Sequence, residues 1–401
     1  LMIRRPPKST LVPYTTLFRS NIDNSEFSGN RAGFYGGAVA VIQEFLGNVS
    51  DSEFSDNSAL YDGGALYLGT DFGAIANNSN INGSVFAGNS AGQDGGAVAV
   101  IHEFHGAVSD SLFLGNSAVR YGGAMFFGMS SGGFNIELTA TRGNLTLFSG
   151  NTDANGPNSL YFGARSANAV TANIIVSGAG NVMLLDPLRV AMNGGLSNFF
   201  TLTRDDAGQG GVFGWAGANV VDSGNRVNVY LTSGRTDLRP DFSFDAGGAN
   251  GSKIEFGADH VLGLALAGRD PNQAVFGGFG AATAAAGTRI AAPRSFLPYA
   301  GDYLFVEGQD VAANFSVENS GIFRGGLSAD GAGNTWLSAA YNPYADSTSA
   351  TRKAAPALEQ WLWDSAPGLV MSQAEFAKII SHPDDMLPDA WVTQGRAAMN
   401  L

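Results

Sequence analysis

The chain has 401 residues, of which 55 are glycine, 14 are proline and none is cysteine. Only 14% of the residues are charged, and the net charge of −13 disfavours a nucleic-acid partner, which needs clustered Lys and Arg. The missing cysteine excludes a disulfide scaffold, a Cys-ligated zinc site and a thiol nucleophile, and no apolar run is long enough for a membrane-spanning helix.

Residues 1–20 differ in composition from the chain that follows. They carry four basic residues, including the only Lys before Lys253, and residues 2–20 resemble translated sequencing-adapter read-through. A secretory signal is the alternative, but Pro6 and Pro7 follow the first charges and no apolar core comes next. We interpret residues 1–20 as an artefact leader and expect the true N-terminus to be missing.

Residues 21–164 contain five copies of Phe-x-x-Asn, and in four of them Gly-Gly-Ala begins nine residues after the Phe. The Phe-to-Phe steps are 27, 32, 27 and 35 residues, and the fifth copy has lost its Gly pair. Residues 36–62 match residues 95–121 closely, so the duplicated unit is two repeats long. The repeat residues are Phe27, Asn30, Gly36, Gly37, Phe54, Asn57, Gly63, Gly64, Phe86, Asn89, Gly95, Gly96, Phe113, Asn116, Gly122, Gly123, Phe148 and Asn151.

Repeats of this length, built from short apolar runs and Gly/Asn turns, are typical of the coils of a parallel β-solenoid. We expect each Phe to stack inside, each Asn to bond the neighbouring coil in a left-handed turn, and each Gly pair to allow positive φ and close backbone approach. About 320 residues at roughly 25–30 per coil predict about 11–13 coils. Period-two alternation after each Gly pair predicts these inward side chains: Val39, Val41, Leu66, Leu68, Val98, Val100, Met125 and Phe127.

The two half-motifs at fixed offset resemble the repeat of the polymorphic outer membrane proteins, which are type V autotransporter adhesins. The resemblance is specific over 21–164 and weaker over 165–343, which look like a passenger stalk whose last coils are 302–341. It implies an all-β, right-handed parallel β-helix on the surface or outside of a Gram-negative cell, with a translocating β-barrel at the C-terminus. The implied function is adhesion to a host-cell or extracellular glycan or protein, with no cofactor and no catalytic residue.

Residues 344–401 depart from that family. A polar linker follows Pro343, and 357–363 and 373–380 have helical composition, which predicts a short helical linker. The 58 residues after Pro343 are too few for twelve barrel strands of about 9–11 residues each. We therefore expect the chain's own β-barrel to be absent and the chain to be a fragment cut at both ends.

Two acidic or histidine-containing motifs are candidate metal sites. His102, Glu103 and His105 have metal-ligand spacing, but the duplicated unit has Gln43 and Leu46 at the two His positions, so we expect no metal there. Asp62 and Asp94 precede the Gly pair in successive coils and lie about 4.8 Å apart if stacked. One Ca²⁺ would fit between them, but we favour a solvated acidic edge.

The residues opposite the apolar face are Ala40, Tyr67, Ala99 and Phe126. An outward aromatic on every second coil suggests Tyr67 and Phe126 as ligand-contact residues, and lateral packing is the alternative interpretation, which we favour. A secreted polysaccharide lyase or hydrolase is the enzymatic alternative to an adhesin. It needs basic and acidic groups that converge on one face, whereas 21–164 has only three Arg and no Lys. A fragment that helps to fold and secrete the passenger is a third interpretation, which suits 250–345.

Overall fold

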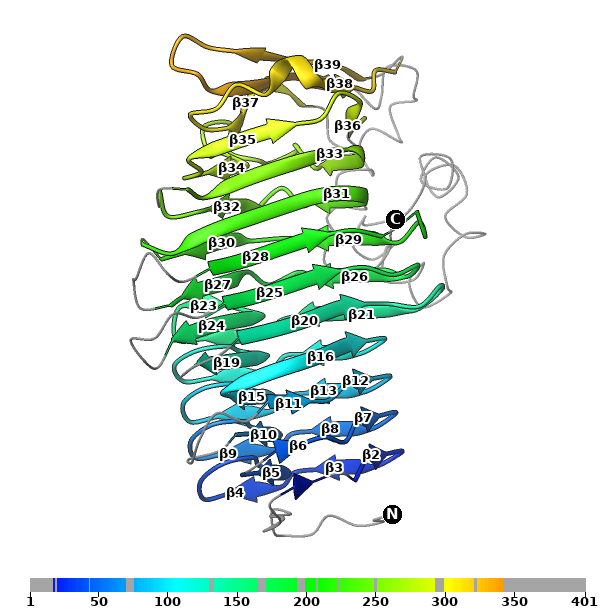
Figure 1. Ribbon diagram of the computed structural model, residues 1–401, viewed down its shortest axis with the longest axis vertical. Helices are drawn as coiled ribbons and strands as arrows, with labels where there is room; N and C mark the ends of the chain where they lie inside the picture. The colour runs from blue at the N-terminus through cyan, green and yellow to red at the C-terminus, as the bar shows by residue number, and fades with distance from the viewer. Residues whose placement is uncertain are drawn as a thin grey trace, which may run out of the picture.

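The computed structural model describes residues 17–18, 20–42, 44–69, 76–129, 133–164, 171–192, 199–206, 208–222, 224–248, 251–292, 299–320 and 323–341. These residues form an all-β parallel solenoid of about nine turns, stacked as a rod with the N-terminal coils at one end (Figure 1). Within them there is one short 3-10 helix, η1 (Ala312–Asn314), and no α-helix. The helical linker predicted within 344–401 lies outside the described residues, as does most of the leader.

One sheet of 12 strands runs along the rod. Its strands pair in parallel from the first coil to β37, and the last two strands are antiparallel. In sheet order from the N-terminal end they are β5 (Val39–Val41), β10 (Leu66–Leu68), β15 (Val98–Ile101), β19 (Met125–Met129), β24 (Leu160–Ala164), β27 (Leu188–Ala191), β30 (Ala218–Val221), β32 (Ser243–Asp245), β34 (Phe276–Gly277), β37 (Tyr299–Val306), β40 (Thr335–Tyr341) and β39 (Phe323–Ala329).

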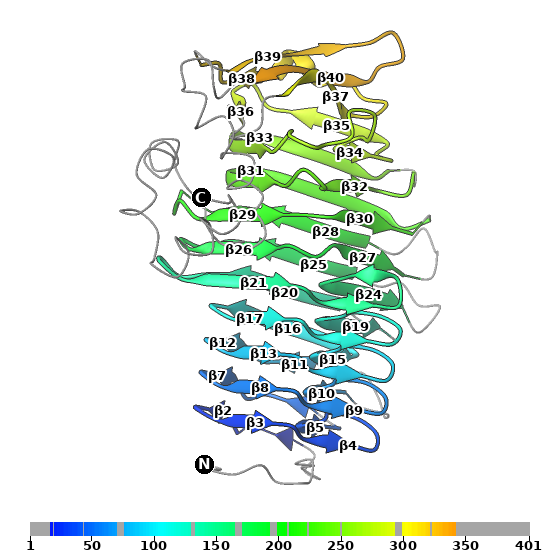
Figure 2. The ribbon, with the colours of Figure 1, turned by 180° about the vertical axis from the view of Figure 1, so that it is seen from behind.

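A second sheet of 20 strands forms the opposite wall, which Figure 2 shows from behind. In the early coils each turn contributes two or three short strands to this sheet, and later β31 and β33 span its width as single long strands. The strands are β2 (Ile22–Asp23), β3 (Glu26–Ser28), β7 (Val49–Ser50), β8 (Glu53–Ser55), β11 (Ala76–Asn78), β12 (Ile81–Asn82), β13 (Val85–Ala87), β16 (Glu103–Ser109), β17 (Leu112–Leu114), β20 (Gly133–Thr139), β21 (Leu145–Ser149), β25 (Thr171–Val176), β26 (Asn181–Leu184), β28 (Phe199–Arg204), β29 (Val212–Trp215), β31 (Arg226–Leu238), β33 (Lys253–Leu264), β35 (Ala281–Ala284), β36 (Thr288–Ala291) and β38 (Phe315–Val317).

Two smaller sheets complete the coils. A six-stranded sheet joins the two walls along the first coils, and a two-stranded sheet pairs residues 17–18 at the end of the leader with the first full coil. The six strands are β4 (Arg31–Ala32), β9 (Ser58–Ala59), β14 (Ser90–Ala91), β18 (Ser117–Ala118), β22 (Thr152–Asp153) and β23 (Gly156–Pro157), and the other pair is β1 (Leu17–Phe18) with β6 (Glu44–Phe45).

The main apolar core runs from Ile22 to Tyr341. All eight side chains that the period-two pattern places inside are buried in it, so this prediction is confirmed. Because every coil buries its apolar face against the next one, the core is continuous along the rod and stability depends on neighbouring coils.

The C-terminal end of the rod differs from the prediction. β38 still stacks in parallel on β36, but β40 pairs antiparallel with β37, and β39 pairs antiparallel with β40. Residues 302–341 therefore do not all form further coils. The predicted 11–13 coils are too many, because this hairpin ends the stack and because some turns are as long as the 36 residues from Phe148 to Leu184.

A buried polar cluster interrupts the apolar core in the later coils. Arg204 donates to the carbonyl oxygens of Val176 and Gly211 and lies 3.5 Å from the carboxylate of Asp206. His260 on β33 is completely buried, its Nδ1 lies 3.2 Å from the carbonyl oxygen of Ser233, and its Nε2 has no hydrogen-bond partner. Burial lowers the pKa of His260 to about 4, so this imidazole is neutral at physiological pH.

Candidate functional site

The Phe residues of the five repeats form one ladder inside the solenoid, as predicted. Successive rings from Phe27 to Phe148 are stacked with centroids 4.6–4.9 Å apart, which is the spacing of the parallel strands that carry them. Since β3, β8, β13, β17 and β21 are in register, equal side chains lie directly above one another. Stacked aromatic pairs add to the stability that burial itself provides.

The Asn residues of the repeats form a second ladder, also as predicted. In each coil the backbone N–H and the side-chain Nδ2 donate to Oδ1 of the next Asn, at 2.9–3.1 Å. From the second coil onward Nδ2 also donates to the carbonyl oxygen of the preceding coil's Phe, at 2.9 Å. The left-handed residue is not the Asn but its predecessor, for example Gly29 or Asp56.

The ladder ends on a carboxylate that lies outside the five Phe-x-x-Asn repeats. Asp186 accepts from the backbone N–H and Nδ2 of Asn151 and from the backbone N–H of Gly150. Burial raises the pKa of Asp186, while these three hydrogen bonds act in the opposite direction. At the other end of the ladder Oδ1 of Asn30 is buried without a partner.

The two glycines of each pair have different roles, which confirms both parts of the prediction. The first glycine has a positive φ, between 58° and 71° in the four copies, which other residues rarely adopt. The second glycine leaves no room for a Cβ, because the backbone of the next coil fills the space. A Cβ on Gly64, for example, would overlap the carbonyl oxygen of Gly96.

Tyr67 and Phe126 lie opposite the main core, as predicted, but they are not available to a ligand. Each is only 3% exposed, and both belong to a second apolar cluster with Ala40, Ala99 and Tyr161. Tyr67 stacks on Tyr35 with centroids 4.5 Å apart. The exposed aromatic stripe is therefore wrong, and the alternative of lateral packing agrees with the structure, because ladder contacts cover this face.

Asp62 and Asp94 stack as predicted but do not form a solvated edge. They are 3% and 1% exposed, and the backbone N–H of Asp94 donates to Oδ1 of Asp62 at 3.2 Å. Arg120 from the next coil donates to both carboxylate oxygens of Asp94, at 2.6 and 3.2 Å. The Asp94 carboxylate raises the pKa of Arg120. The carboxylate of Asp94 is therefore paired with the Arg120 guanidinium of the same chain.

The surface above these aspartates is an apolar strip that sequence reasoning missed. We call it the corner: residues 33–35, 60–62, 92–94 and 119–121, in the turns that lead from β4, β9, β14 and β18 into the 12-stranded sheet. The side chains of Phe34, Leu60 and Val119 are 59–66% exposed, and Tyr121 is 37% exposed. The signal was present in the sequence, because large apolar or aromatic residues lie one to three positions after the shared Ala in three of these four coils.

The His-containing motif lies on the surface of β16. His105 Nε2 is 3.7 Å from the Glu103 carboxylate, and its Nδ1 is 2.8 Å from Nδ2 of Asn135 in the next coil. His102 precedes the strand with a φ of 83°, in the left-handed region. Across the described part of the chain, no group of three or more His, Asp or Glu side chains is placed to hold a metal ion.

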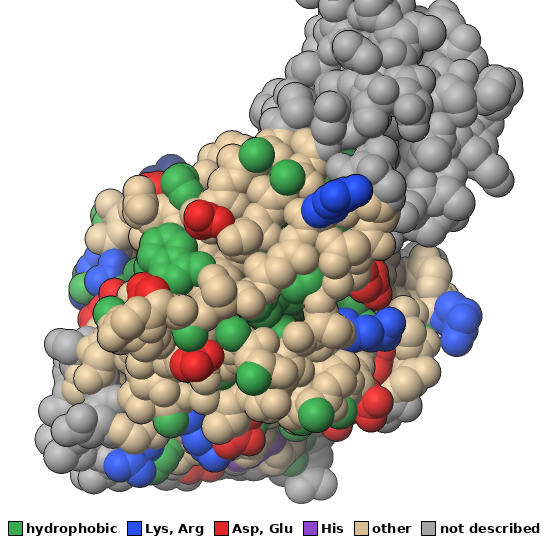
Figure 3. All heavy atoms as spheres, turned by 90° about the horizontal axis from the view of Figure 1, so that it is seen from above, with side chains coloured by type: hydrophobic (Ala, Val, Ile, Leu, Met, Phe, Trp, Pro, Cys, Tyr) green, Lys and Arg blue, Asp and Glu red, His purple; other side chains and the backbone are tan. Residues whose placement is uncertain are grey.

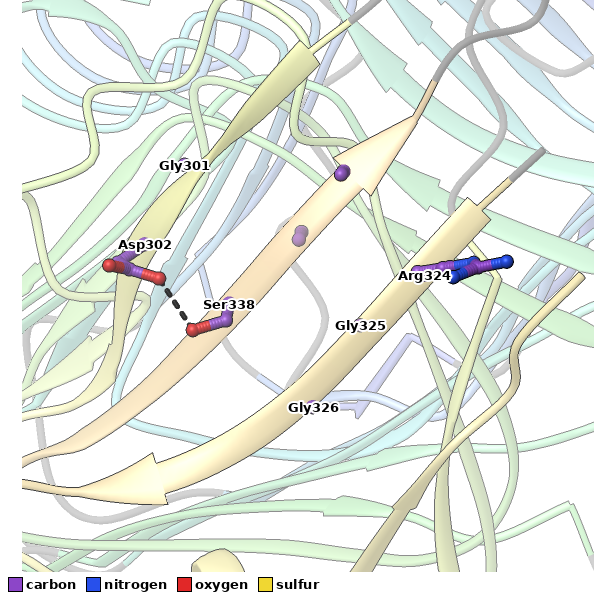
Figure 4. A pocket seen from close by; sticks show the side chains of 8 residues that line it. Gly301, Asp302, Arg324, Gly325, Gly326 and Ser338 are labelled. Atoms are coloured by element: carbon purple, nitrogen blue, oxygen red, sulfur yellow. Dashed lines mark hydrogen bonds between the residues drawn. The ribbon is translucent and has the colours of Figure 1, made fainter. Parts of the chain in front are cut away.

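A shallow depression of about 380 Å³ lies on the C-terminal hairpin, at the end of the rod seen in Figure 3. Small residues of β37, β39 and β40 line it, including Gly301, Gly325 and Ala339. Asp302 accepts a hydrogen bond from Ser338 on one side, and Arg324 extends from the far strand on the other (Figure 4). The acidic and basic groups are thus held apart by a floor of small side chains.

Comparison with known proteins gives one match. Residues 51–69 match the Chlamydia polymorphic membrane protein repeat, and this segment spans β8 to β10 with Phe54, Asn57 and the Gly63–Gly64 pair. No curated protein and no solved structure matches the chain. None of these comparisons supports the interpretation of residues 1–20 as adapter read-through. The second coil of this solenoid is thus similar to the repeat of the Chlamydia polymorphic membrane proteins.

Proposed function

We propose that the chain is an autotransporter passenger, displayed or secreted by a Gram-negative bacterium, and that it acts as an adhesin. The observation that carries the proposal is the match of residues 51–69 to the polymorphic membrane protein repeat. The residues that define this repeat build the Phe and Asn ladders of the first five coils. The match therefore falls on the residues that shape the rod.

The architecture supports a presenting role. A parallel solenoid is extended, and its turns lie at the surface where they can vary without disturbing the stacked strands. The net charge of −13 favours solubility of such a rod outside a cell. Within the described residues no helix is long and apolar enough to cross a membrane.

Display is tested on intact bacteria that carry the gene. An antibody raised against the purified chain is expected to label unpermeabilised cells or the culture supernatant, and external protease should remove the cell-bound signal. A periplasmic marker is the control for cell integrity. Labelling that appears only after permeabilisation would contradict display and secretion alike.

Adhesion is tested with the purified full chain, fluorescently labelled, on epithelial cells and on a glycan array. We expect saturable binding that unlabelled chain displaces. The matched control is Phe86→Asp, which puts an unpaired charge into the Phe ladder and should unfold the repeat coils. If the folded chain binds and the Phe86→Asp variant does not, the result supports an adhesin. Depolymerisation of a polysaccharide, followed as new reducing ends or unsaturated products, would instead favour the lyase or hydrolase alternative.

A further inference from the structure

The corner exposes apolar side chains in an alternating pattern along the rod. Gly33, Leu60, Gly92 and Val119 occupy the same position in coils one to four, because the backbone N–H groups of the last three donate to the carbonyls of Ala32, Ala59 and Ala91 in the preceding coil. Small and large residues therefore alternate along this column, with successive coils about 4.8 Å apart. Leu60 and Val119 project as two knobs. Gly33 leaves a hole, because a Cβ there would meet nothing within 4 Å, whereas Gly92 presents only backbone, since the carbonyl oxygen of Leu60 fills its Cβ position.

The neighbouring column carries a second pattern. Phe34, Tyr61, Gln93 and Arg120 follow one another in successive coils, connected by backbone hydrogen bonds of 2.9 Å. The rings of Phe34 and Tyr61 stack with centroids 5.7 Å apart at one end of the column. The side chain of Arg120 is 47% exposed at the other end. The column thus has an aromatic end and a cationic end.

We propose that the corner is a dimer interface at which it packs, antiparallel, against the corner of a second copy of this chain. A two-fold axis between coils two and three places coil one opposite coil four, and coil two opposite coil three. Leu60 then faces Gly92 of the other copy, and Val119 faces its Gly33. The same operation brings Arg120 over Phe34, a favourable cation–π pairing.

The pattern specifies a second copy because it is self-complementary under that one rotation. In the first column each projecting side chain meets a glycine, and in the second column the cationic end meets the aromatic end while Tyr61 faces Gln93. Two-fold interfaces are the commonest in soluble oligomers and require a patch that complements itself in this way. The small–large order of the first column is complementary to its own reverse, which is the property that a two-fold interface between identical chains requires.

Electrostatics permit this contact despite the acidic composition. The only two carboxylates of the corner, Asp62 and Asp94, are buried. Arg120 is held by Asp94, so the interface side of the strip carries no exposed negative charge. Two copies with a net charge of −13 each can therefore approach at the corner more readily than at an acidic face.

The corner is also rigid before it binds. Its turns are joined by stacked backbone hydrogen bonds and fastened underneath by the pair of Arg120 with Asp94. A preorganised surface loses little conformational entropy on association. Because the strip is only four coils long, we expect a weak dimer that dissociates on dilution.

Sedimentation equilibrium of the purified full chain over a range of concentrations tests the proposal. We expect a monomer–dimer equilibrium, with a dissociation constant at least about tenfold higher for Leu60→Asp. The matched control is Ile175→Asp, which alters an exposed large apolar side chain on β25, outside the corner. Circular dichroism verifies that both variants are folded. A wild type that stays monomeric, or a dimer that Leu60→Asp leaves unchanged, would overturn the proposal.

Filling a hole tests the geometry without removing an apolar group. A Cβ on Gly33 meets nothing within 4 Å, so Gly33→Val should leave the monomer intact and weaken the dimer by occluding the site for Val119. Val119→Gly removes the knob that faces it. Combining Gly33→Val with Val119→Gly exchanges knob and hole and should restore the dimer, whereas additive weakening would rule out this pairing.

Cross-linking determines the direction, since the chain has no native cysteine. A Phe34→Cys chain mixed with an Arg120→Cys chain should form a disulfide-linked heterodimer under mild oxidation. In the antiparallel arrangement the two Phe34 positions are about 14 Å apart, or three coil spacings, so Phe34→Cys alone should not cross-link. Efficient cross-linking of Phe34→Cys alone would show a parallel arrangement and refute the antiparallel dimer.

Discussion

At the residue scale, the side-chain amide of Asn89 shows how many hydrogen bonds one buried ladder residue makes. Its Oδ1 accepts from the backbone N–H and Nδ2 of Asn57, and its Nδ2 donates to the Phe54 carbonyl and to Asn116. All four side-chain hydrogen bonds are buried. A buried polar group left without its partner costs about 1–3 kcal/mol, so the loss of this amide affects several groups at once.

We expect Asn89→Ala to lower the free energy of unfolding by at least about 3 kcal/mol, because it leaves buried donors and acceptors in both neighbouring coils without a hydrogen-bond partner. Asn48 is a matched control, since it accepts from the backbone and side chain of Asn80 in the same way but at the surface. Asn48→Ala should cost less than about 1 kcal/mol, because water replaces the lost bonds. Urea unfolding curves measure both changes, and equal costs would contradict a special role of the buried ladder.

His260 makes stability depend on pH. Its pKa is about 4 in the folded chain against 6.5 in the unfolded chain, so the unfolded state binds a proton first as the pH falls. This contribution to stability is complete above pH 6.5 and is lost as the pH falls toward 4, by up to about 3 kcal/mol.

Unfolding free energies of wild type and His260→Gln, compared between pH 7 and pH 4, test this prediction. The variant should lack the part of the slope that belongs to the imidazole. Asp186 acts in the opposite sense, because its raised pKa makes stability greatest at low pH and reduces it as the pH rises. Asp186→Asn is therefore a second variant in the same experiment, and it should lack the loss of stability that Asp186 causes as the pH rises. Parallel slopes for wild type and His260→Gln would show that the imidazole does not titrate as expected.

At the scale of the element, the Gly pair sets the distance between coils. Gly64 has an ordinary φ but no space for a Cβ beside the carbonyl of Gly96, whereas Gly33 in a preceding turn faces open space. Gly64→Ala should force two coils apart and destabilise the fold by about 1–3 kcal/mol or more, the usual cost of overpacking. Gly33→Ala should be neutral or stabilising by up to about 1 kcal/mol. Thermal unfolding of the two variants measures the contrast, and similar melting temperatures would disprove the steric argument.

Much of each repeated element could be predicted from the sequence, because a recurrent residue in a parallel stack must meet its own equivalent. The Phe ladder, the Asn ladder and the inward Val39 and Val41 follow from spacing and period alone. Whether the side chains opposite the core face, such as Tyr67, are exposed or buried could not be predicted in the same way. Alternation shows on which side Tyr67 lies, but what packs against that side depends on turns such as that of Tyr35.

The antiparallel hairpin escaped prediction for a different reason. An alternating strand such as β40 has the same pattern in either direction, so its sequence does not show whether it continues the coil or turns back. The buried pair of Asp94 and Arg120 was missed because the two residues belong to different coils. Residues 26 apart can be recognised as partners only once the register of the turns is known.

At the scale of the whole molecule, the rod behaves as a row of coupled units. Each coil contacts its neighbours only, so a local defect should weaken the adjacent coils more than distant ones. The hairpin of β39 and β40 covers the C-terminal end of the core, and Leu337 of β40 is buried in that core. It should therefore protect the last coils and leave the repeat coils unaffected.

Leu337→Ala tests this view. We expect faster amide hydrogen exchange in β34, β37 and the hairpin, and unchanged protection in the ladder strands of the first coils. Mass spectrometry of proteolytic fragments after exchange gives the comparison. Uniformly faster exchange along the whole chain would mean that the rod unfolds as one cooperative unit.

The duplicated two-coil unit allows the length of the rod to change by recombination within the gene. Its copies begin at Gly36 and Gly95, and recombination between them would delete 59 residues and join Tyr35 directly to Gly95. The shortened chain would still place a Phe above a Phe and an Asn above an Asn, since every coil presents the same contacts to the next. Rod length can therefore change in steps of two coils between generations, without any new interface having to evolve.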